Sequence, residues 1–132
     1  MTARQRSRKE ATHDLILDVT ARALRREGFA GVRVADVMAE AGLTHGGFYA
    51  HFPSRDALLA EALARAARDS GAVIAEAAAN RAPGTSPFRA LVETYLSDTH
   101  LRSCESGCPI AALGADMPRQ SLAVREASVL RV

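Results

Sequence analysis

The fold of this chain is decided by residues 28–59, which read GFAGVRVADVMAEAGLTHGGFYAHFPSRDALL. Apolar residues recur at helical spacing from Arg33 to Ala41, and Gly42 supplies the stop by accepting the left-handed conformation that ends helices. Only Leu43 separates this glycine from Thr44, a good N-cap residue. A further helix must therefore begin almost at once and cross the previous helix steeply, which is the geometry of a helix-turn-helix.

This second helix is short, and its beginning runs against local propensity. Pro53 and Ser54 predict the start of the next helix a few residues later. Gly46 and Gly47 stand in its first turn, where each costs roughly 1 kcal/mol relative to alanine. Close approach of a DNA duplex would explain that cost, because phosphates are attracted to the N–H groups at a helix N-terminus and a helix in the major groove needs a slim leading end. A loop marked by the two glycines is the alternative.

The aromatic and imidazole side chains of this helix have two interpretations each. Tyr49 and His51 are suited to hydrogen bonds with phosphate oxygens, which carry little sequence information. Core packing explains Phe48 and Phe52 at least as well as DNA contact, but it explains Tyr49 less well because the hydroxyl needs water or a partner. His45 and His51 also fit plain solvent-exposed positions.

The flanking sequence predicts helices throughout. Alanine, the best helix former, supplies 27 residues. We expect an amphipathic helix from about Ser7 to Glu27, with Gly28 as its stop and an apolar stripe made of Leu15, Ile16, Val19 and Ala23. The elements expected after the helix-turn-helix are a long helix from Ser54 to about Asn80, a linker over residues 81–87 and a helix from about Phe88 to Arg102. The predicted fold class is therefore all-α.

The charge distribution excludes a protein that is basic over its whole surface. The chain has 17 basic and 15 acidic residues, for a formal net charge of +2. Four of the basic residues lie within the first nine positions, where there is no acidic residue: Arg4, Arg6, Arg8 and Lys9. Direct contact of Arg8 or Lys9 with a DNA backbone is one interpretation of this arm, and a solvated tail is the other.

Several other classes of protein are excluded by what the sequence lacks. Its apolar stretches fall far short of the roughly 20 residues needed to span a bilayer, and the N-terminus does not read as a signal peptide. Two cysteines are too few for a secreted disulfide framework, so we expect a cytoplasmic protein. No zinc-protease, nucleophile-elbow, Walker or dinucleotide motif occurs, so we expect neither an enzyme nor a cofactor.

The two cysteines form a separate candidate site. Cys108 precedes Pro109, a favoured first helical residue, so its sulfur would lie at a helix N-terminus where the dipole favours a thiolate. A sensor of oxidants or electrophiles is one interpretation, and a small buried apolar side chain is the commoner one. His100, Cys104 and Cys108 are spaced as ligands on one helix, but Gly107 and Pro109 break that helix. We therefore expect no metal site.

The stretch quoted above closely resembles the DNA-binding segment of the TetR/AcrR family of bacterial transcriptional regulators. The likeness extends over about 60 residues and combines several fixed spacings, which makes it specific. It implies a three-helix DNA-binding head, a second helical domain that binds a small molecule and dimerises, and repression relieved by that ligand. The resemblance, with Arg33 added as a nearby cation, gives these DNA-contacting candidates: Arg33, Thr44, His45, Gly46, Gly47, Phe48, Tyr49, His51 and Arg55.

The chain departs from the family pattern at positions that usually contact DNA. Val32 stands for a threonine, Ala35 for a frequent arginine, and His45 for the lysine that begins the recognition helix. Arg55 stands for a phosphate-binding lysine, and its planar fork can grip a phosphate with two hydrogen bonds. The operator sequence therefore does not follow from the family pattern.

The predicted organisation is a DNA-binding head over residues 8–70, with the helix-turn-helix at 33–52, followed by a partial helical regulatory domain over residues 71–132. A homodimer is expected from the resemblance, although the two C-terminal helices that usually form its interface are not found before Val132. The predicted function is a sequence-specific transcriptional regulator, most often a repressor, that binds double-stranded operator DNA and is released by a small-molecule or reactive effector. The alternatives are a helical protein-interaction module without DNA and a thiol-based redox sensor.

Overall fold

The computed structural model describes residues 7–129, and within them the chain forms helices and no strand, which confirms the predicted all-α fold. The predicted contacts of Arg4 and Arg6 lie outside the described residues. In chain order the elements are α1 (Arg8–Gly31), α2 (Val34–Glu40), the 3₁₀ helix η1 (His45–Ala50), α3 (Arg55–Ala79), α4 (Pro87–Tyr95), α5 (Asp98–Arg102), α6 (Pro109–Leu113), the 3₁₀ helix η2 (Met117–Arg119) and α7 (Leu122–Val129).

The ends of α1 and α2 follow from their sequences. Ser7 and Glu10 form a capping box, in which the Ser7 hydroxyl accepts the Glu10 N–H at 3.1 Å and the Glu10 carboxylate accepts the Ser7 N–H at 2.8 Å. Gly28 has φ 77° and interrupts α1 before its last short turn, and Gly42 has φ 71° directly after α2. Both predicted glycine stops are therefore confirmed, because these left-handed conformations strain residues with a Cβ.

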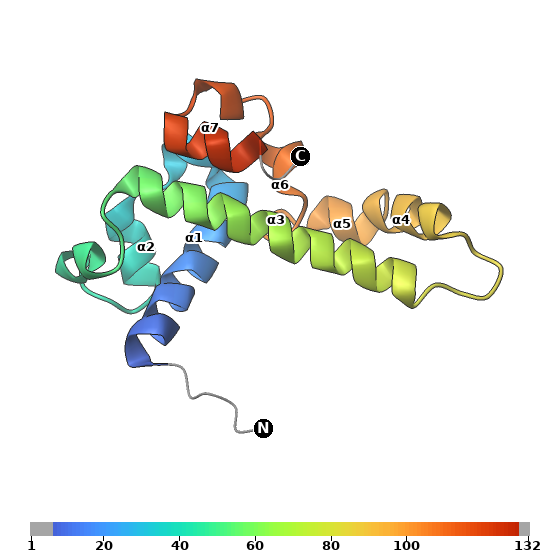
Figure 1. Ribbon diagram of the computed structural model, residues 1–132, viewed down its shortest axis with the longest axis horizontal. Coiled ribbons are helices and arrows are strands. Elements are labelled where there is room, and N and C mark those ends of the chain that lie inside the picture. The colour runs from blue at the N-terminus through green and yellow to red at the C-terminus, as the bar shows by residue number, and fades with distance from the viewer. Residues whose placement is uncertain (1–6, 130–132) are drawn as a thin grey trace.

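The core lies where α1 crosses the first half of α3 and α2 packs alongside (Figure 1). The apolar stripe of α1 buries Ile16, Val19 and Ala23, as predicted. Leu15 was predicted on the same stripe but is 42% exposed, because it lies one helical residue, or about 100°, away from Ile16. From α3, the side chains that complete this core are those of Leu58, Leu59, Ala62 and Leu63.

The long helix α3 has the predicted extent, but the helix predicted from Phe88 to Arg102 is two helices. The first, α4, turns back along the distal half of α3 after the linker (Figure 1). It ends at Tyr95, and Ser97 begins α5 by accepting the His100 N–H with its hydroxyl at 3.1 Å. The prediction of one helix was wrong because a serine hydroxyl competes with the backbone and favours a new helix start.

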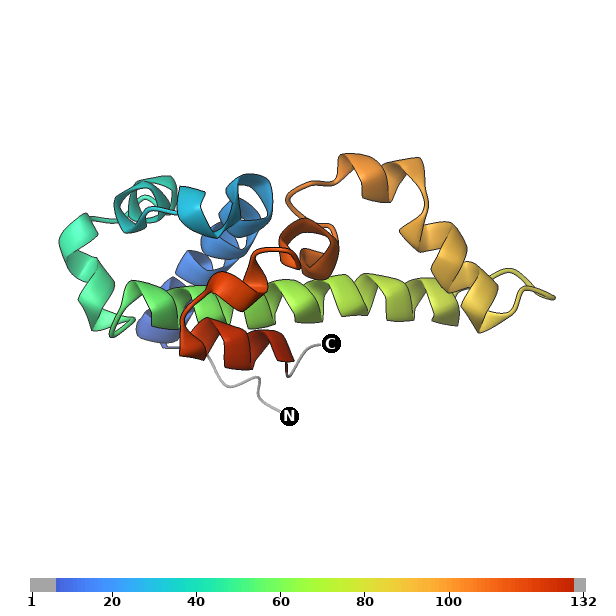
Figure 2. The same ribbon diagram turned by 90° about the horizontal axis from the view of Figure 1, so that it is seen from above.

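The last helices return to the first half of α3. Figure 2 shows α7 beside this half of α3, with α6 between it and the helices α4 and α5. Leu113, Met117 and Val124 join the same apolar cluster as the side chains of α1 and α3. The division into domains at residue 70 stays a prediction. Within residues 7–129, none of the helices combines the length and the apolar character that crossing a bilayer requires.

Candidate nucleic-acid interface

The element that follows the turn after α2 is a single 3₁₀ helix, η1, and not the α-helix that the spacing suggests. Thr44 occupies its N-cap position, but the threonine hydroxyl makes no capping hydrogen bond. The Gly47 N–H instead donates to the Thr44 carbonyl at 3.1 Å, and the His51 N–H donates to the Phe48 carbonyl at 2.9 Å. The i to i+3 bonding makes this element narrower than an α-helix.

The two glycines of η1 have no intramolecular reason to be glycine. A Cβ built on Gly46 meets no heavy atom within 4 Å, and one built on Gly47 makes only ordinary contacts with Thr44 and Met38 at 3.6 Å and 3.8 Å. Neither glycine is among the positive-φ residues. Within residues 7–129, neither crowding nor backbone conformation therefore requires glycine at these two positions.

The outward face of this region carries polar and cationic groups. Tyr49 is 73% exposed, and its ring rests edge-on against Phe48 with the centroids 5.1 Å apart. His45 and Arg33 are also exposed, with Arg33 at the N-cap of α2. The tyrosine hydroxyl, the imidazole and the guanidinium thus reach solvent from two short elements joined by one turn.

Two candidates from the sequence do not share this exposure. Phe48 is 1% exposed and packs against Phe52, with ring centroids 5.8 Å apart, so its side chain serves the core and is removed from the DNA-contacting set. His51 is half-buried, and its Nδ1 atom has no hydrogen-bond partner among the described residues. Both results follow from the orientation of η1. One side of η1 packs on the core through Phe48, and the opposite side faces solvent.

Arg55 uses its fork within the protein. Its Nε donates to the Val32 carbonyl at 3.1 Å, and its Nη2 donates to the carbonyls of Phe29 and Val32. The expectation that one planar edge of this guanidinium is open for a two-bond phosphate contact is therefore corrected. The reason is that the end of α1 and the residue after it leave carbonyls without helical partners, and a half-buried arginine satisfies them.

His13 is a supporting residue that the sequence reasoning missed. Its ring stacks on Phe52 with centroids 4.3 Å apart, and its Nε2 lies 2.9 Å from a carboxylate oxygen of Glu61. The imidazole thereby ties α1 to α3 beneath the end of η1. No local pattern could have revealed it, because the three residues belong to distant parts of the sequence.

The N-terminal arm and the cysteines are placed as follows. Arg8 and Lys9 are exposed in the first turn of α1.

Cys104 is exposed and Cys108 is half-buried, and both line one cleft beside α5 and α6. The His100 imidazole, considered above with the cysteines as a ligand, instead accepts the Cys108 N–H at its Nε2, 3.2 Å away. Residues 7–129 contain no group of three metal-ligating side chains.

These features define a helix-turn-helix head: two short helices at a glycine turn, held on α1 and α3, with a slim polar edge exposed. Residues 16–62 match the family model described as "Bacterial regulatory proteins, tetR family". This segment of the chain is therefore similar in sequence to the TetR family. The resemblance found in the sequence is thereby confirmed.

The fold is shared with solved structures of the same kind. A transcriptional regulator of the TetR family from Agrobacterium tumefaciens has a TM-score of 0.76 at 20% sequence identity, over 93% of this chain and 64% of that one. The fatty acid degradation regulator FadR from Bacillus halodurans has a TM-score of 0.61 at 14% identity, over 94% of this chain and 62% of that one. The chain thus spans less than two thirds of the length of either. No curated protein matches it.

Proposed function

We propose that this protein is a transcriptional regulator that binds double-stranded operator DNA through η1 and the N-terminus of α2. The observation that carries the proposal is the pair Gly46 and Gly47, which have no intramolecular cause and stand at the exposed tip of a helix-turn-helix. A tip without side chains lets the backbone N–H groups approach phosphates or the floor of a groove closely. The match of residues 16–62 to the TetR family model supports the same conclusion.

The exposed groups around this tip divide into two kinds of contact. Arg33 and Tyr49 are suited to phosphate oxygens, which fix orientation and carry no sequence information. Thr44 and His45 lie at the leading end of η1, where base edges are read. Arg8 and Lys9 would extend the phosphate contacts from the start of α1. Arg55 takes the role of positioning the α1–α2 connection, because its fork already holds that connection.

As part of this proposal, the regulator acts as a repressor in the cytoplasm and is released by a small molecule. The feature that supports an effector is the cleft of about 450 Å³ beside α5 and α6, which lies outside the proposed DNA surface. A homodimer would place two heads on half-sites about 34–36 Å apart, as paired helix-turn-helix proteins do. We therefore expect the operator to be a palindrome.

Fluorescence anisotropy tests the proposal with a labelled palindromic duplex taken from the promoter region upstream of the gene for this protein. We expect affinity for this duplex to exceed that for a scrambled duplex and to fall steeply as salt is raised, because phosphate contacts release counterions. Affinity for the palindrome that equals affinity for the scrambled duplex, or the absence of binding at low salt, would refute the function.

The variant Gly46→Ala isolates the role of the slim tip. Its methyl group meets nothing inside the protein, so the unfolding free energy stays within about 1 kcal/mol of the parent. We expect affinity for the palindrome to fall about tenfold, or about 1.4 kcal/mol, because the methyl occupies the space of the approaching duplex. Gly71→Ala is the matched control, since its Cβ also meets nothing and lies far along α3. Equal affinities for the two variants would contradict the assignment of η1.

A further inference from the structure

The cleft beside α5 and α6 contains both cysteines of the chain. Cys104 and Cys108 line it together with apolar side chains that include Leu96, Leu101 and Ala112. Cys104 is exposed to solvent, whereas Cys108 is half-buried. A small apolar molecule in this cleft would therefore be held against a thiol that is partly shielded from water.

The surroundings of Cys108 orient the residue on two sides. Its N–H donates to the His100 Nε2 at 3.2 Å, and the His100 Nδ1 lies 2.7 Å from the Tyr95 carbonyl oxygen. These partners fit an imidazole that donates from Nδ1 and accepts at Nε2, so the ring bridges α4 to Cys108. The interaction of the Tyr95 hydroxyl with the Cys108 thiol raises the pKa of the tyrosine.

The loop that ends at Cys108 is tied to the head. Arg25, although only 8% exposed, extends its Nη1 to the Gly107 carbonyl at 3.2 Å while its Nε donates to the Ala21 carbonyl at 3.0 Å. The neighbouring Arg26 donates to the Glu105 carboxylate at 2.6 Å. Two arginines of α1 therefore hold the loop on either side of Ser106.

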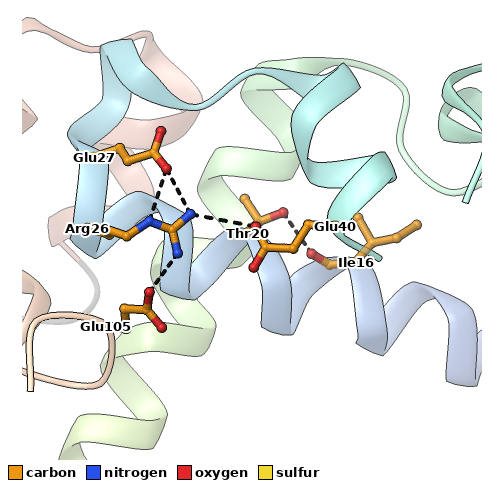
Figure 3. A network of polar contacts seen from close by, with 6 residues as sticks. All are labelled: Ile16, Thr20, Arg26, Glu27, Glu40 and Glu105. Carbon is orange, nitrogen blue, oxygen red and sulfur yellow. Dashed lines mark hydrogen bonds and ion pairs between the residues drawn. The ribbon is translucent and has the colours of Figure 1, made fainter. Parts of the chain in front are cut away.

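The same arginine also reaches the helix-turn-helix. Figure 3 shows the Arg26 guanidinium between Glu27, Glu105 and Glu40, the last residue of α2. Its Nη2 lies 3.6 Å from the Glu40 carboxylate. A displacement of the loop would alter the partners of a side chain that also contacts α2.

We propose that Cys108 is a site of covalent modification by small, uncharged, apolar electrophiles such as α,β-unsaturated ketones. The Cys108 sulfur adds to the β-carbon, so a carbon–sulfur bond forms while the carbon–carbon π bond breaks. Its electron pair moves to the carbonyl oxygen as an enolate, and the proton of the thiol is returned by solvent to the α-carbon. No oxidant or reductant takes part.

The class of electrophile follows from the walls of the cleft. The lining of the cleft is mostly apolar and carries, among the residues that the structure describes, no charged side chain of the Asp, Glu, Lys or Arg type, so it favours an uncharged reagent beside the half-buried Cys108. Polar or charged thiol reagents should meet the exposed Cys104 first. Cys104→Ser and Cys108→Ser are therefore matched variants, because both thiols border the same cleft and differ in their access to water.

Intact-mass spectrometry with 2-cyclohexen-1-one tests the modification on the whole chain. We expect one reagent mass on the parent and on Cys104→Ser, added about tenfold faster than on Cys108→Ser, a difference of about 1.4 kcal/mol in the barrier. The charged reagent 5,5′-dithiobis(2-nitrobenzoate) should show the opposite preference, for Cys104. Equal rates of enone addition to the two variants, or faster addition to Cys108→Ser, would overturn the proposal.

A second measurement asks whether the adduct reaches the head, and this part rests on the proposed function. The adduct enlarges the side chain at Cys108 and should displace the loop held by Arg25 and Arg26, so we expect affinity of the enone-treated Cys104→Ser variant for the palindrome to fall about tenfold. Treated Cys108→Ser should keep its affinity. An adduct at Cys108 with unchanged DNA affinity would refute the coupling. Absent DNA binding before treatment would refute the proposed function and leave the mass result standing.

Discussion

The two halves of α3 differ sharply in what they bury. The first half, residues 55–66, places every apolar side chain of its inner face in the core: Leu58, Leu59, Ala62, Leu63 and Ala66. The second half, residues 67–79, contains no buried residue, and Val73 is 54% exposed. One continuous helix thus joins a closed core to a region where the apolar contacts are shallow.

This difference indicates where the molecule is rigid and where it can yield. The helix-turn-helix is fixed on the first half, so the geometry of its exposed edge is determined by well-packed side chains. The helices α4 and α5 lie beside the second half, and Phe88, Leu101 and the Leu96 that follows α4 are each about three-quarters exposed. Segments with few buried contacts open at lower free energy, which suits a region that contains the proposed effector cleft.

The largest expected effect comes from removing one phenylalanine ring from the core of the helix-turn-helix and one from α4. Phe48→Ala deletes a ring that is 1% exposed, and we expect a loss of about 3–5 kcal/mol in the free energy of unfolding. Phe88→Ala deletes a ring that is 74% exposed, and its effect should stay within about 0.5 kcal/mol. Urea unfolding followed by circular dichroism measures both. Similar losses for the two variants would show that the second half is as firmly packed as the first.

A smaller effect is expected from the arginines at the two ends of α3. Arg55 is half-buried and satisfies the Phe29 and Val32 carbonyls, so Arg55→Ala should cost about 1–3 kcal/mol by leaving carbonyls unpaired. Arg81 also donates to backbone carbonyls, of Ala78 and Thr85, but it is exposed. We expect Arg81→Ala to cost less than about 0.5 kcal/mol, because water replaces the lost bonds. Thermal unfolding of both variants decides the point, and a larger loss for Arg81→Ala would contradict it.

The sequence predicted the elements that local chemistry controls. Gly28 and Gly42 end helices because their conformation is left-handed, and Ser54 starts α3 by accepting the Ala57 N–H with its hydroxyl. Cys108 and Pro109 begin α6 as predicted. Each of these signals acts within a few residues, so each could be recognised without knowledge of the tertiary structure.

What the sequence could not predict depends on residues distant in the chain. Nothing local indicates that Arg25 reaches Gly107, 82 positions away, or that Arg55 turns inward to the connection before α2. The inward face of η1 was also uncertain, because a run of six residues is too short to show a period, and only packing against Phe52 fixes Phe48 in the core.

The smallest expected effect concerns the ion pair that links the two regions. The hydrogen bond from Arg26 lowers the pKa of the Glu105 carboxyl below its ordinary value of 4.5. Because the folded pKa is depressed, the contribution of this pair is present above pH 4.5 and is lost as the pH falls through the lowered value. We expect the Gly107 amide resonance to shift over that range in nuclear magnetic resonance spectra of the whole chain, since its loop is held through Glu105.

Two glutamine variants separate this link from an ordinary surface pair. Glu105→Gln should remove most of the acid-dependent shift at Gly107, because the amide does not titrate. Glu93→Gln is the matched control, since Glu93 pairs with Arg89 at 2.7 Å within α4 and connects no distant segments. We expect this control to leave the Gly107 shift intact. If both variants removed the shift, or neither did, the Arg26–Glu105 pair would not hold the loop. The contact of the buried Arg25 with the Gly107 carbonyl would then be the link between the loop and α1.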